Sequence, residues 1–337
     1  MENFIVSARK YRPATFDMVV GQDSITNTLK AAIKNRHLTQ AYLFCGPRGV
    51  GKTTCARIFA KTINCSNLSD NGEACNECES CHSFNTLRSF NIHELDAASN
   101  NKVDDIRSLT DQVRIPPQVG KYSIYIIDEV HMLSTSAFNA FLKTLEEPPS
   151  HAIFILATTE KHKIIPTILS RCQIFDFNRI RIEDIVGRLM YVAKNEGVTA
   201  EEEALHIISQ KADGALRDAL SIFDQIVSIS GKKITYKDVI ENLNVLDFEY
   251  YFETVAGALR GDVSSVLLTF NEILEKGFDG HNFISGLGSH LRNILVCKDE
   301  VTVKLLEATP AIKQRYLQQT AVCSEDFIFR ALEQLSN

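Results

Sequence analysis

Residues 46–53 have the spacing of a phosphate-binding loop. Their sequence, GPRGVGKT, matches the pattern G-x-x-x-x-G-K-[ST] and lies between an apolar run and a helical pattern. Glycines allow backbone N–H groups to curl around phosphate oxygens, and the N-terminus of a following helix adds positive potential. We expect Lys52 to reach the β- and γ-phosphates of a nucleotide and Thr53 to offer its hydroxyl to Mg²⁺. The alternative is a glycine-rich turn with an incidental lysine.

An apolar run over residues 124–127 ends in two acidic residues, Asp128 and Glu129. Successive residues on a strand face opposite sides, so the two carboxylates have different roles. We expect Asp128 to organise the Mg²⁺ shell and Glu129 to polarise a water for attack on the γ-phosphate. The alternative is a polar strand end with two solvated carboxylates. His131 follows closely, but a histidine on such a loop is more often structural, and we assign it no role.

Four cysteines, Cys65, Cys75, Cys78 and Cys81, are spaced as ligands of one metal ion. Four thiolates complete a tetrahedral Zn²⁺ site with no open position, which predicts a structural rather than a catalytic zinc. The surrounding sequence is polar and loop-like, so metal binding would supply its folding energy. Two alternatives stay open: small buried cysteines on one helix face, and His82 as a rival fourth ligand. The remaining cysteines are expected in the core: Cys45, Cys55, Cys172, Cys297 and Cys323.

The elements that position these residues alternate between strands and helices over the first 180 residues. Near-continuous apolar runs predict strands covered on both faces at 41–46, 92–97, 122–128 and 152–158. Helical patterns occur at 51–63, 102–113 and 134–147. Ser134 is expected to cap the last of these helices, and Pro148 and Pro149 to end it. The alternation predicts an α/β fold with a mostly parallel sheet and helices on both sides.

Beyond about residue 180 the strand signal disappears and the pattern is helical. Three amphipathic stretches predict a small bundle: 182–197, 199–213 and 215–230. Further helical patterns follow from about residue 245 onward. We therefore predict three domains, with boundaries at 1–178, 179–243 and 244–337.

Composition limits the classes of protein that this chain can be. Of its 337 residues 45% are hydrophobic and 23% charged, which excludes disorder, collagen-like repeats and disulfide-dense miniproteins. With 36 Lys and Arg against 42 Asp and Glu, the net charge is −6, so any contact with DNA must be local. Neither a transmembrane run nor a signal peptide is recognisable, and the nine cysteines do not suggest a disulfide framework. We therefore expect the protein to be located in a reducing cytoplasm.

Taken together, these motifs resemble the AAA+ clamp-loader ATPases over essentially the whole chain. Further matching segments are Tyr-Arg-Pro at 11–13, Phe16 with Val-Gly-Gln at 20–22, DAASNN at 96–101, FNAFLKTLEEPP at 138–149, LATTE at 156–160, SRC at 170–172 and GALRDAL at 214–220. A four-cysteine insert beside a complete set of ATPase motifs is similar to the gamma/tau type of bacterial DNA polymerase III. A delta-prime-like subunit would be expected to have lost the phosphate-binding loop.

The resemblance implies roles for further residues. Thr159 lies where the family has its sensor 1, with Thr158 as the neighbouring candidate. Arg217 resembles sensor 2, which reaches from a helical lid to the nucleotide of its own subunit. Arg171 resembles an arginine finger offered to the ATP of a neighbouring subunit. The nucleotide-binding residues are then expected to be Val19, Val20, Gly46, Pro47, Arg48, Gly49, Val50, Gly51, Lys52, Thr53, Thr54 and Arg217.

The same resemblance implies domain roles, cofactors and partners. Residues 1–178 would be an AAA+ ATPase domain with a zinc module at 65–81, residues 179–243 a helical lid, and residues 244–337 an oligomerisation collar. ATP, Mg²⁺ and structural Zn²⁺ are the expected cofactors. The partners would be delta and delta-prime subunits, other gamma/tau copies in a ring, a sliding clamp and primer-template DNA.

In this family, ATP binding and hydrolysis load the clamp onto primed DNA. Residues 97–102 and Arg107 are the candidates that face DNA, and an ordinary strand-to-helix loop is the alternative for them.

Two other functions are alternatives to that of a clamp loader. Another DNA-acting AAA+ motor, such as a branch-migration helicase, would share the phosphate-binding loop, the acidic pair and the sensors. It would not share the four-cysteine insert or the placement of the SRC motif. A zinc-stabilised scaffold that binds nucleotide without hydrolysing it is the non-enzymatic possibility. The intact set of Lys52, Thr53, Asp128, Glu129 and Arg217 argues against the scaffold.

Overall fold

The computed structural model describes residues 5–336 except 87–88, 118–119, 244 and 307. The chain divides into two compact units. The first contains residues 1–192 and 211–224, and the second residues 193–210 and 225–337. Residues 1–4, 244 and 337, at the limits of the predicted domains, lie outside the described residues. The three-domain division therefore stays a prediction.

The first unit is built on a five-stranded sheet in the order β2-β3-β4-β1-β5, with every pair parallel. Its strands are β1 (Ala41–Cys45), β2 (Ile92–Asp96), β3 (Ser123–Asp128), β4 (Ala152–Thr158) and β5 (Gln173–Asp176). The predicted parallel sheet is confirmed, and four of these strands were expected from their apolar runs. Strand β5 was not, because its sequence, QIFD, is short and polar at both ends.

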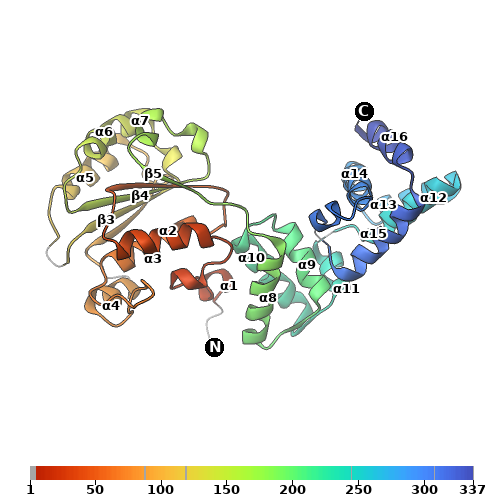
Figure 1. Ribbon diagram of the computed structural model, residues 1–337, viewed down its shortest axis with the longest axis horizontal. Coiled ribbons are helices and arrows are strands. Elements are labelled where there is room, and N and C mark those ends of the chain that lie inside the picture. The colour runs from red at the N-terminus through yellow and green to blue at the C-terminus, as the bar shows by residue number, and fades with distance from the viewer. Residues whose placement is uncertain (1–4, 87–88, 118–119, 244, 307, 337) are drawn as a thin grey trace. The chain divides into compact units, whose positions relative to one another are not determined.

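Helices cover both faces of this sheet (Figure 1). On one face lie α2 (Asp23–Lys34) and α3 (Lys52–Ile63), and on the other α5 (Val103–Val113) and α6 (Thr135–Glu146). Each strand therefore contributes alternate residues to two separate cores. Double burial explains why β1, β3 and β4 are near-continuously apolar. The prediction that β2 is covered on both faces is wrong, because β2 lies at an edge of the sheet and none of its residues is fully buried.

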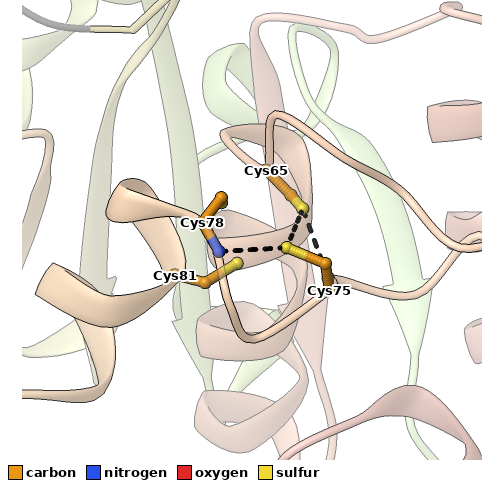
Figure 2. A group of neighbouring side chains, drawn as sticks. All are labelled: Cys65, Cys75, Cys78 and Cys81. Atoms are coloured by element: carbon orange, nitrogen blue, oxygen red, sulfur yellow. Dashed lines mark hydrogen bonds between the residues drawn. The ribbon is translucent and has the colours of Figure 1, made fainter.

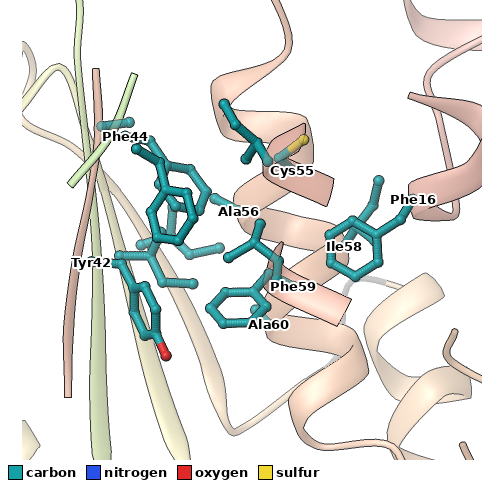
Figure 3. Packing of buried hydrophobic residues seen from close by; sticks show 14 of the residues in the cluster. Phe16, Tyr42, Phe44, Cys55, Ala56, Ile58, Phe59 and Ala60 are labelled. Atoms are coloured by element: carbon teal, nitrogen blue, oxygen red, sulfur yellow. The ribbon is translucent and has the colours of Figure 1, made fainter. Parts of the chain in front are cut away.

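The alternation is clear in β1. Tyr42 and Phe44 belong to the core beneath α3, whereas Leu43 and Cys45 belong to the core beneath α6. On α3, the buried ring of Phe59 packs edge-to-face against Tyr42, with the ring centroids 4.9 Å apart (Figure 3). An aromatic pair of this geometry adds to the hydrophobic effect that attaches the helix to the sheet.

The start of α6 is as expected. The Ser134 hydroxyl accepts a hydrogen bond from the Ala137 N–H at 3.2 Å, which satisfies one of the free amides of the first turn. The helix ends at Glu146, shortly before Pro148 and Pro149. The predicted N-cap is therefore confirmed.

Among the remaining elements of the first unit, the helices at 182–196 and 216–230 coincide with predicted helical patterns, whereas the shorter ones were not predicted. These elements are α1 (Ser7–Lys10), η1 (Phe16–Met18), α4 (Glu79–Asn85), η2 (Val130–Met132), η3 (Lys161–Lys163), α7 (Pro166–Leu169), α8 (Ile182–Glu196) and α10 (Leu216–Ser230). Helices α8 and α10 each continue into the second unit, and the last residue of α9 (Glu202–Lys211) belongs to the first. The expected absence of strands after residue 180 is wrong, because β6 (Thr199–Ala200) pairs in parallel with β7 (Lys233–Ile234). Two-residue strands leave no periodic pattern.

The second unit is otherwise helical. Its elements are α9 (Glu202–Lys211), α11 (Tyr236–Leu243), α12 (Phe248–Arg260), α13 (Val263–Glu275), α14 (Gly280–Val296), η4 (Thr302–Leu305), α15 (Pro310–Val322) and α16 (Glu325–Ser336). Phe252, Leu291, Ile294, Tyr316 and Ile328 form the centre of its core. Helix α15 was not predicted because KQRYLQQT interrupts its apolar periodicity. None of the described helices is both long and apolar enough to cross a bilayer.

We expect Phe59→Ala to lower the free energy of unfolding by about 3–5 kcal/mol, because it opens a cavity between α3 and the sheet. Chemical denaturation followed by circular dichroism measures this change. Phe90→Ala is the matched control, since the Phe90 side chain is 92% exposed. Equal losses of unfolding free energy in the two variants would contradict the packing of Phe59 between α3 and the sheet.

Candidate nucleotide site and cysteine cluster

The loop between β1 and α3 has a backbone that only glycine adopts easily. Gly46 has φ +147°, and a Cβ added there would lie 2.4 Å from the carbonyl oxygen of Phe177. Gly49 has φ +79°, and its added Cβ would lie 2.9 Å from that of Ala215. These two glycines therefore allow the loop to pass close to its neighbours, as a phosphate-binding loop requires.

Lys52 begins α3 and is buried inside this loop, with 6% of its surface exposed. Its ammonium donates hydrogen bonds of 2.7 Å to the carbonyl oxygens of Gly46 and Pro47. Burial lowers the pKa of Lys52, and the carboxylates of Glu129 and Asp128 oppose this shift. The ammonium thus lies at the centre of the loop, held by neutral acceptors.

Thr53, Asp128 and Glu129 form the opposite side of the site. The Thr53 hydroxyl donates to Asp128 Oδ2 at 2.7 Å, and the Glu129 N–H donates to Asp128 Oδ1 at 3.0 Å. Glu129 has left-handed backbone conformation with φ +48°, where the chain turns sharply out of β3. A hydroxyl and a carboxylate side by side are the oxygen ligands that Mg²⁺ prefers, so these residues fit that ion.

A second group of side chains lies against Glu129. Thr159 donates a hydrogen bond to Glu129 Oε2 at 3.1 Å, whereas Thr158 is fully buried and contacts His131 Nδ1 at 3.1 Å. His131 Nδ1 is 3.4 Å from Glu129 Oε2, and its Nε2 is 3.4 Å from Glu160 Oε1. The sequence placed this histidine two residues after the acidic pair and assigned it no role, and its contacts with Thr158, Glu129 and Glu160 are those of a residue that positions its neighbours.

A cleft of about 480 Å³ brings most of the predicted nucleotide residues together. It is lined by Val6, Ala8, Arg9, Tyr11, Arg12, Pro13, Val19, Val20, Arg48, Gly49, Val50, Gly51, Lys52, Thr53, Thr54, Asp128, Glu129, Ile180, Leu216, Arg217 and Leu220. Gly46, Pro47 and Thr159 contact residues of this lining without belonging to it. The segments that form the cleft lie far apart in sequence and meet at the carboxyl edge of the sheet.

Four arginines line this cleft, and two of them, Arg217 and Arg12, make hydrogen bonds to the phosphate-binding loop or to the first turn of α3. The Arg217 N–H donates to the Gly49 carbonyl oxygen at 3.3 Å, which places the start of α10 against the phosphate-binding loop. Arg12 donates from Nε to Thr54 Oγ1 at 3.2 Å. The sequence motif at 11–13 contained Arg12, but no role was assigned to it.

Arg171 is not among the residues that line the cleft. Its guanidinium donates to Glu146 Oε1 at 2.8 Å and to the Thr167 carbonyl oxygen at 2.7 Å. Its side chain is 34% exposed, in the turn between α7 and β5. Within its own chain, Arg171 therefore pairs with a glutamate and does not contribute to the nucleotide site.

The predicted DNA-facing loop is an ordered turn at the end of β2. The Asp96 carboxylate accepts hydrogen bonds from the Ala98 N–H at 2.9 Å and the Ser99 hydroxyl at 3.2 Å. Ala97 is buried, so it offers no surface for contact. Arg107 is 71% exposed and lies 3.7 Å from Asp104.

The four predicted metal ligands form a cluster, with all their Sγ atoms within 4.8 Å of one another (Figure 2). The sulfurs of Cys65 and Cys75 are 3.5 Å apart, too far for a disulfide of about 2.0 Å. The Cys75 N–H donates to Cys65 Sγ at 3.3 Å, and the Cys78 N–H to Cys75 Sγ at 3.3 Å. Backbone N–H groups of Glu77 and Cys78 lower the pKa of Cys75, which favours the thiolate that binds metal. This donor set fits a closed Zn²⁺ site.

His82 is exposed and lies outside this cluster, so it is not the fourth ligand of the group. The predicted core cysteines Cys45, Cys55, Cys297 and Cys323 are buried, as expected. Cys172 is only partly buried, because the short strand that follows it lies at the edge of the sheet.

The sheet order, with β4 between β1 and β3, and the phosphate-binding loop with its acidic pair define a P-loop ATPase of the AAA+ class. Solved structures with the same fold include the Thermotoga maritima RuvB Holliday junction branch migration motor. It is 20% identical, with a TM-score of 0.52 over 74% of this chain and 79% of that chain. At this identity the likeness concerns the fold alone.

Comparison with known protein sequences identifies a family within this class. Residues 21–181 match the family model for DNA polymerase III, delta subunit, and residues 184–232 the model for the DNA polymerase III clamp loader subunit, ATPase lid domain. The DNA polymerase III subunit gamma of Buchnera aphidicola subsp. Baizongia pistaciae is 38% identical over 90% of this chain and 82% of its own length. The subunit tau of Bacillus subtilis is 47% identical over 86% of this chain and 51% of its own length.

The chain therefore belongs to the gamma/tau family of DNA polymerase III clamp-loader subunits. The resemblance drawn from the motifs is confirmed. The chain spans about half the length of several of these relatives, 51% of the Bacillus subtilis protein and 55% of a Mycoplasma genitalium subunit gamma/tau.

We expect metal analysis to find about one zinc ion per chain, because four clustered thiolates complete one tetrahedral site. Cys78→Ser should lower the zinc content to well below half of this value. Cys172→Ser is the control, since Cys172 lies outside the cluster and should leave the content unchanged. A metal-free chain with a folded insert would show that the cysteines are merely small packed residues.

Proposed function

We propose that this chain is the ATP-hydrolysing motor subunit of a bacterial replicative clamp loader, which places a sliding clamp on primed DNA. The observation that carries the proposal is the cleft in which Lys52, Thr53, Asp128, Glu129 and Arg217 surround one space. Membership of the gamma/tau family supports the same function.

ATP binding is assigned to the phosphate-binding loop and its neighbours. Lys52 would exchange the carbonyl oxygens of Gly46 and Pro47 for the β- and γ-phosphate oxygens, since charged acceptors form stronger hydrogen bonds than neutral ones. The base would lie against Val19 and Val20, which line the cleft beside the phosphate-binding loop. Loop residues 48–51 would surround the phosphates with backbone N–H groups.

Two residues would hold Mg²⁺. Thr53 and Asp128 already lie within hydrogen-bond distance, and both offer oxygen ligands. Mg²⁺ bound there would neutralise part of the charge on the phosphates.

Glu129 is assigned as the group that orients and polarises the attacking water. Its carboxylate accepts the hydrogen bond from Thr159 and lies beside His131. Thr159 therefore controls the direction of this carboxylate, which is a physical basis for a sensor 1 role. Arg217, anchored against Gly49, would contact the nucleotide of its own subunit as sensor 2.

Arg171 is assigned as an arginine finger that acts on a neighbouring subunit. Its absence from the lining of its own cleft and its partial exposure support this role. Such a finger neutralises charge on the transferred phosphoryl group, and its gain in rate is on the order of 10³–10⁵ in well-studied GTPases.

The proposal includes the partners of the gamma/tau family. We infer assembly with delta and delta-prime subunits and further gamma/tau copies in a ring, with the lid over 179–243 and the collar over 244–337. The ring would grip a sliding clamp and a primer-template junction in the cytoplasm. DNA contact would be local, at residues 98–102 and Arg107, because the net charge of the chain is −6.

The test of this function is steady-state ATP hydrolysis by the chain mixed with delta-type subunits. We expect stimulation that needs both the sliding clamp and a primer-template junction. Stimulation by branched or duplex DNA without any effect of the clamp would instead favour the branch-migration motor. Nucleotide binding without any hydrolysis would favour the scaffold.

We expect Lys52→Ala to weaken ATP binding by roughly 30-fold or more, because it removes a buried cation from the phosphates. Isothermal titration calorimetry with ATP and Mg²⁺ measures the affinity. Lys143→Ala is the control, since Lys143 is exposed on α6. An affinity unchanged by the loss of Lys52 would contradict the assignment of the loop.

We expect Arg171→Ala to leave ATP binding within about twofold and to remove the stimulation by clamp and DNA, because a finger acts only on the transition state. Arg114→Ala matches it as an exposed arginine that pairs with an acidic neighbour, Asp111. Should the Arg171 variant keep its stimulation, the finger role is wrong.

A further inference from the structure

The cysteine insert contacts the N-terminal segment of the chain through a buried carboxylate. Glu73, which lies between Cys65 and Cys75, has only 8% of its surface exposed. Its Oε2 accepts a hydrogen bond from the Phe16 N–H at 3.1 Å, and its Oε1 from the Asp17 N–H at 3.0 Å. One side chain of the insert therefore holds two successive backbone amides at the start of η1.

The charge of this carboxylate is balanced locally. Lys30 of α2 places its ammonium 2.9 Å from Glu73 Oε1 and also pairs with Asp17. A buried carboxylate is costly unless it is both paired and hydrogen-bonded, and Glu73 meets both conditions. Both carboxylate oxygens of Glu73 are therefore used in this contact.

A second contact joins the same two segments. Lys61, buried on α3, donates hydrogen bonds to the Ala14 carbonyl oxygen at 2.8 Å and to Asn76 Oδ1 at 2.7 Å. Asn76 lies between Cys75 and Cys78. Residues 14–17 are thus attached to the insert on both sides of Cys75.

The attached segment connects two parts of the wall of the cleft. Residues 11–13 line the cleft before it, and Val19 and Val20 line the cleft after it, whereas residues 14–17 do not. Phe16 is buried in the same core as Val19 and lies close to Ile58 of α3 (Figure 3). The position of the wall therefore depends on where Phe16 and Asp17 are held.

We propose that Glu73 is a positioning residue for the nucleotide cleft, through which the metal-closed cysteine insert fixes the wall at Val19 and Val20. The inference rests on the proposed function, since it assumes that a nucleotide base occupies this wall. Zinc on Cys65 and Cys75 would fix both ends of the segment that contains Glu73. The insert then fixes the position of one wall of the cleft, although its cysteines are not among the residues that line the cleft.

The first test compares ATP with inorganic tripolyphosphate, which has no base. Glu73→Gln replaces one acceptor oxygen with an NH₂ group, which cannot accept a backbone amide. We expect about tenfold weaker ATP binding, because hydrogen bonds to a charged group are lost. Tripolyphosphate binding should stay within about twofold, since the phosphate-binding loop is untouched. The zinc content of the variant should remain that of the wild type.

Two further variants make this comparison specific. Asp70→Asn removes a carboxylate from the same insert, but Asp70 is exposed, so ATP affinity should be unchanged. Glu73→Asp keeps the charge on a shorter side chain and should give an intermediate loss. Equal weakening of ATP and tripolyphosphate in Glu73→Gln would contradict a role at the base wall.

The second test needs no nucleotide. Hydrogen exchange of residues 14–20 should become about tenfold faster in Glu73→Gln, because one of the two amides loses its acceptor, and also in wild-type protein stripped of metal by a chelator, because the segment that contains Glu73 is then no longer fixed at its ends. Exchange should be normal in Asp70→Asn and in Lys52→Ala.

These outcomes separate the inference from the proposed function. Unchanged exchange over residues 14–20 in Glu73→Gln would overturn the positioning role, whether or not the chain bound ATP. Faster exchange with unchanged ATP affinity would show that the cleft does not depend on this contact. A wild-type chain without affinity for ATP or tripolyphosphate would contradict the proposed function, while the exchange data would still decide the role of Glu73 in holding the segment.

Discussion

Parallel pairing of β1 with β4, and of β4 with β3, is the constraint on which the rest of the first unit depends. Cys45 pairs with Thr158 and Ile127 with Leu156, so the three strands end at one edge of the sheet. Because both faces of these strands are buried, a shift of register by one residue would exchange the two cores. The loops that follow the strands must therefore emerge together, and the cleft is formed from them.

Features that depend on local sequence were predictable. The glycine spacing of residues 46–53, the acidic pair after β3 and the Ser134 cap each act through neighbouring backbone, so the pattern alone indicates them. The same holds for β1, β3 and β4, whose double burial requires apolar runs. Strands β2 and β5 lie at the two edges of the sheet and each pairs with a single strand, and β5, the shorter of the two, has no such run.

Features that depend on contacts between distant residues were not predictable in detail. His131 meets Glu129 and Thr158 because two strand ends are adjacent, and nothing in the sequence around residue 131 records this. The distinction between Thr158 and Thr159 likewise depends on which residue ends the buried part of β4. Arg12 and Glu73 join segments that are 42 and 57 residues apart. Such pairings follow from the fold and have no periodic signal.

The ion pair between Arg171 and Glu146 has a consequence for how quickly the Arg171 side chain can change its partner. Both side chains are partly exposed, 34% and 48%, and a pair of this kind contributes no more than about 1 kcal/mol. An arginine held so weakly can exchange its partner by simple rotation of its own side chain, on the timescale of surface rotamers. The guanidinium of Arg171 can therefore leave Glu146 without any element of the fold having to unfold.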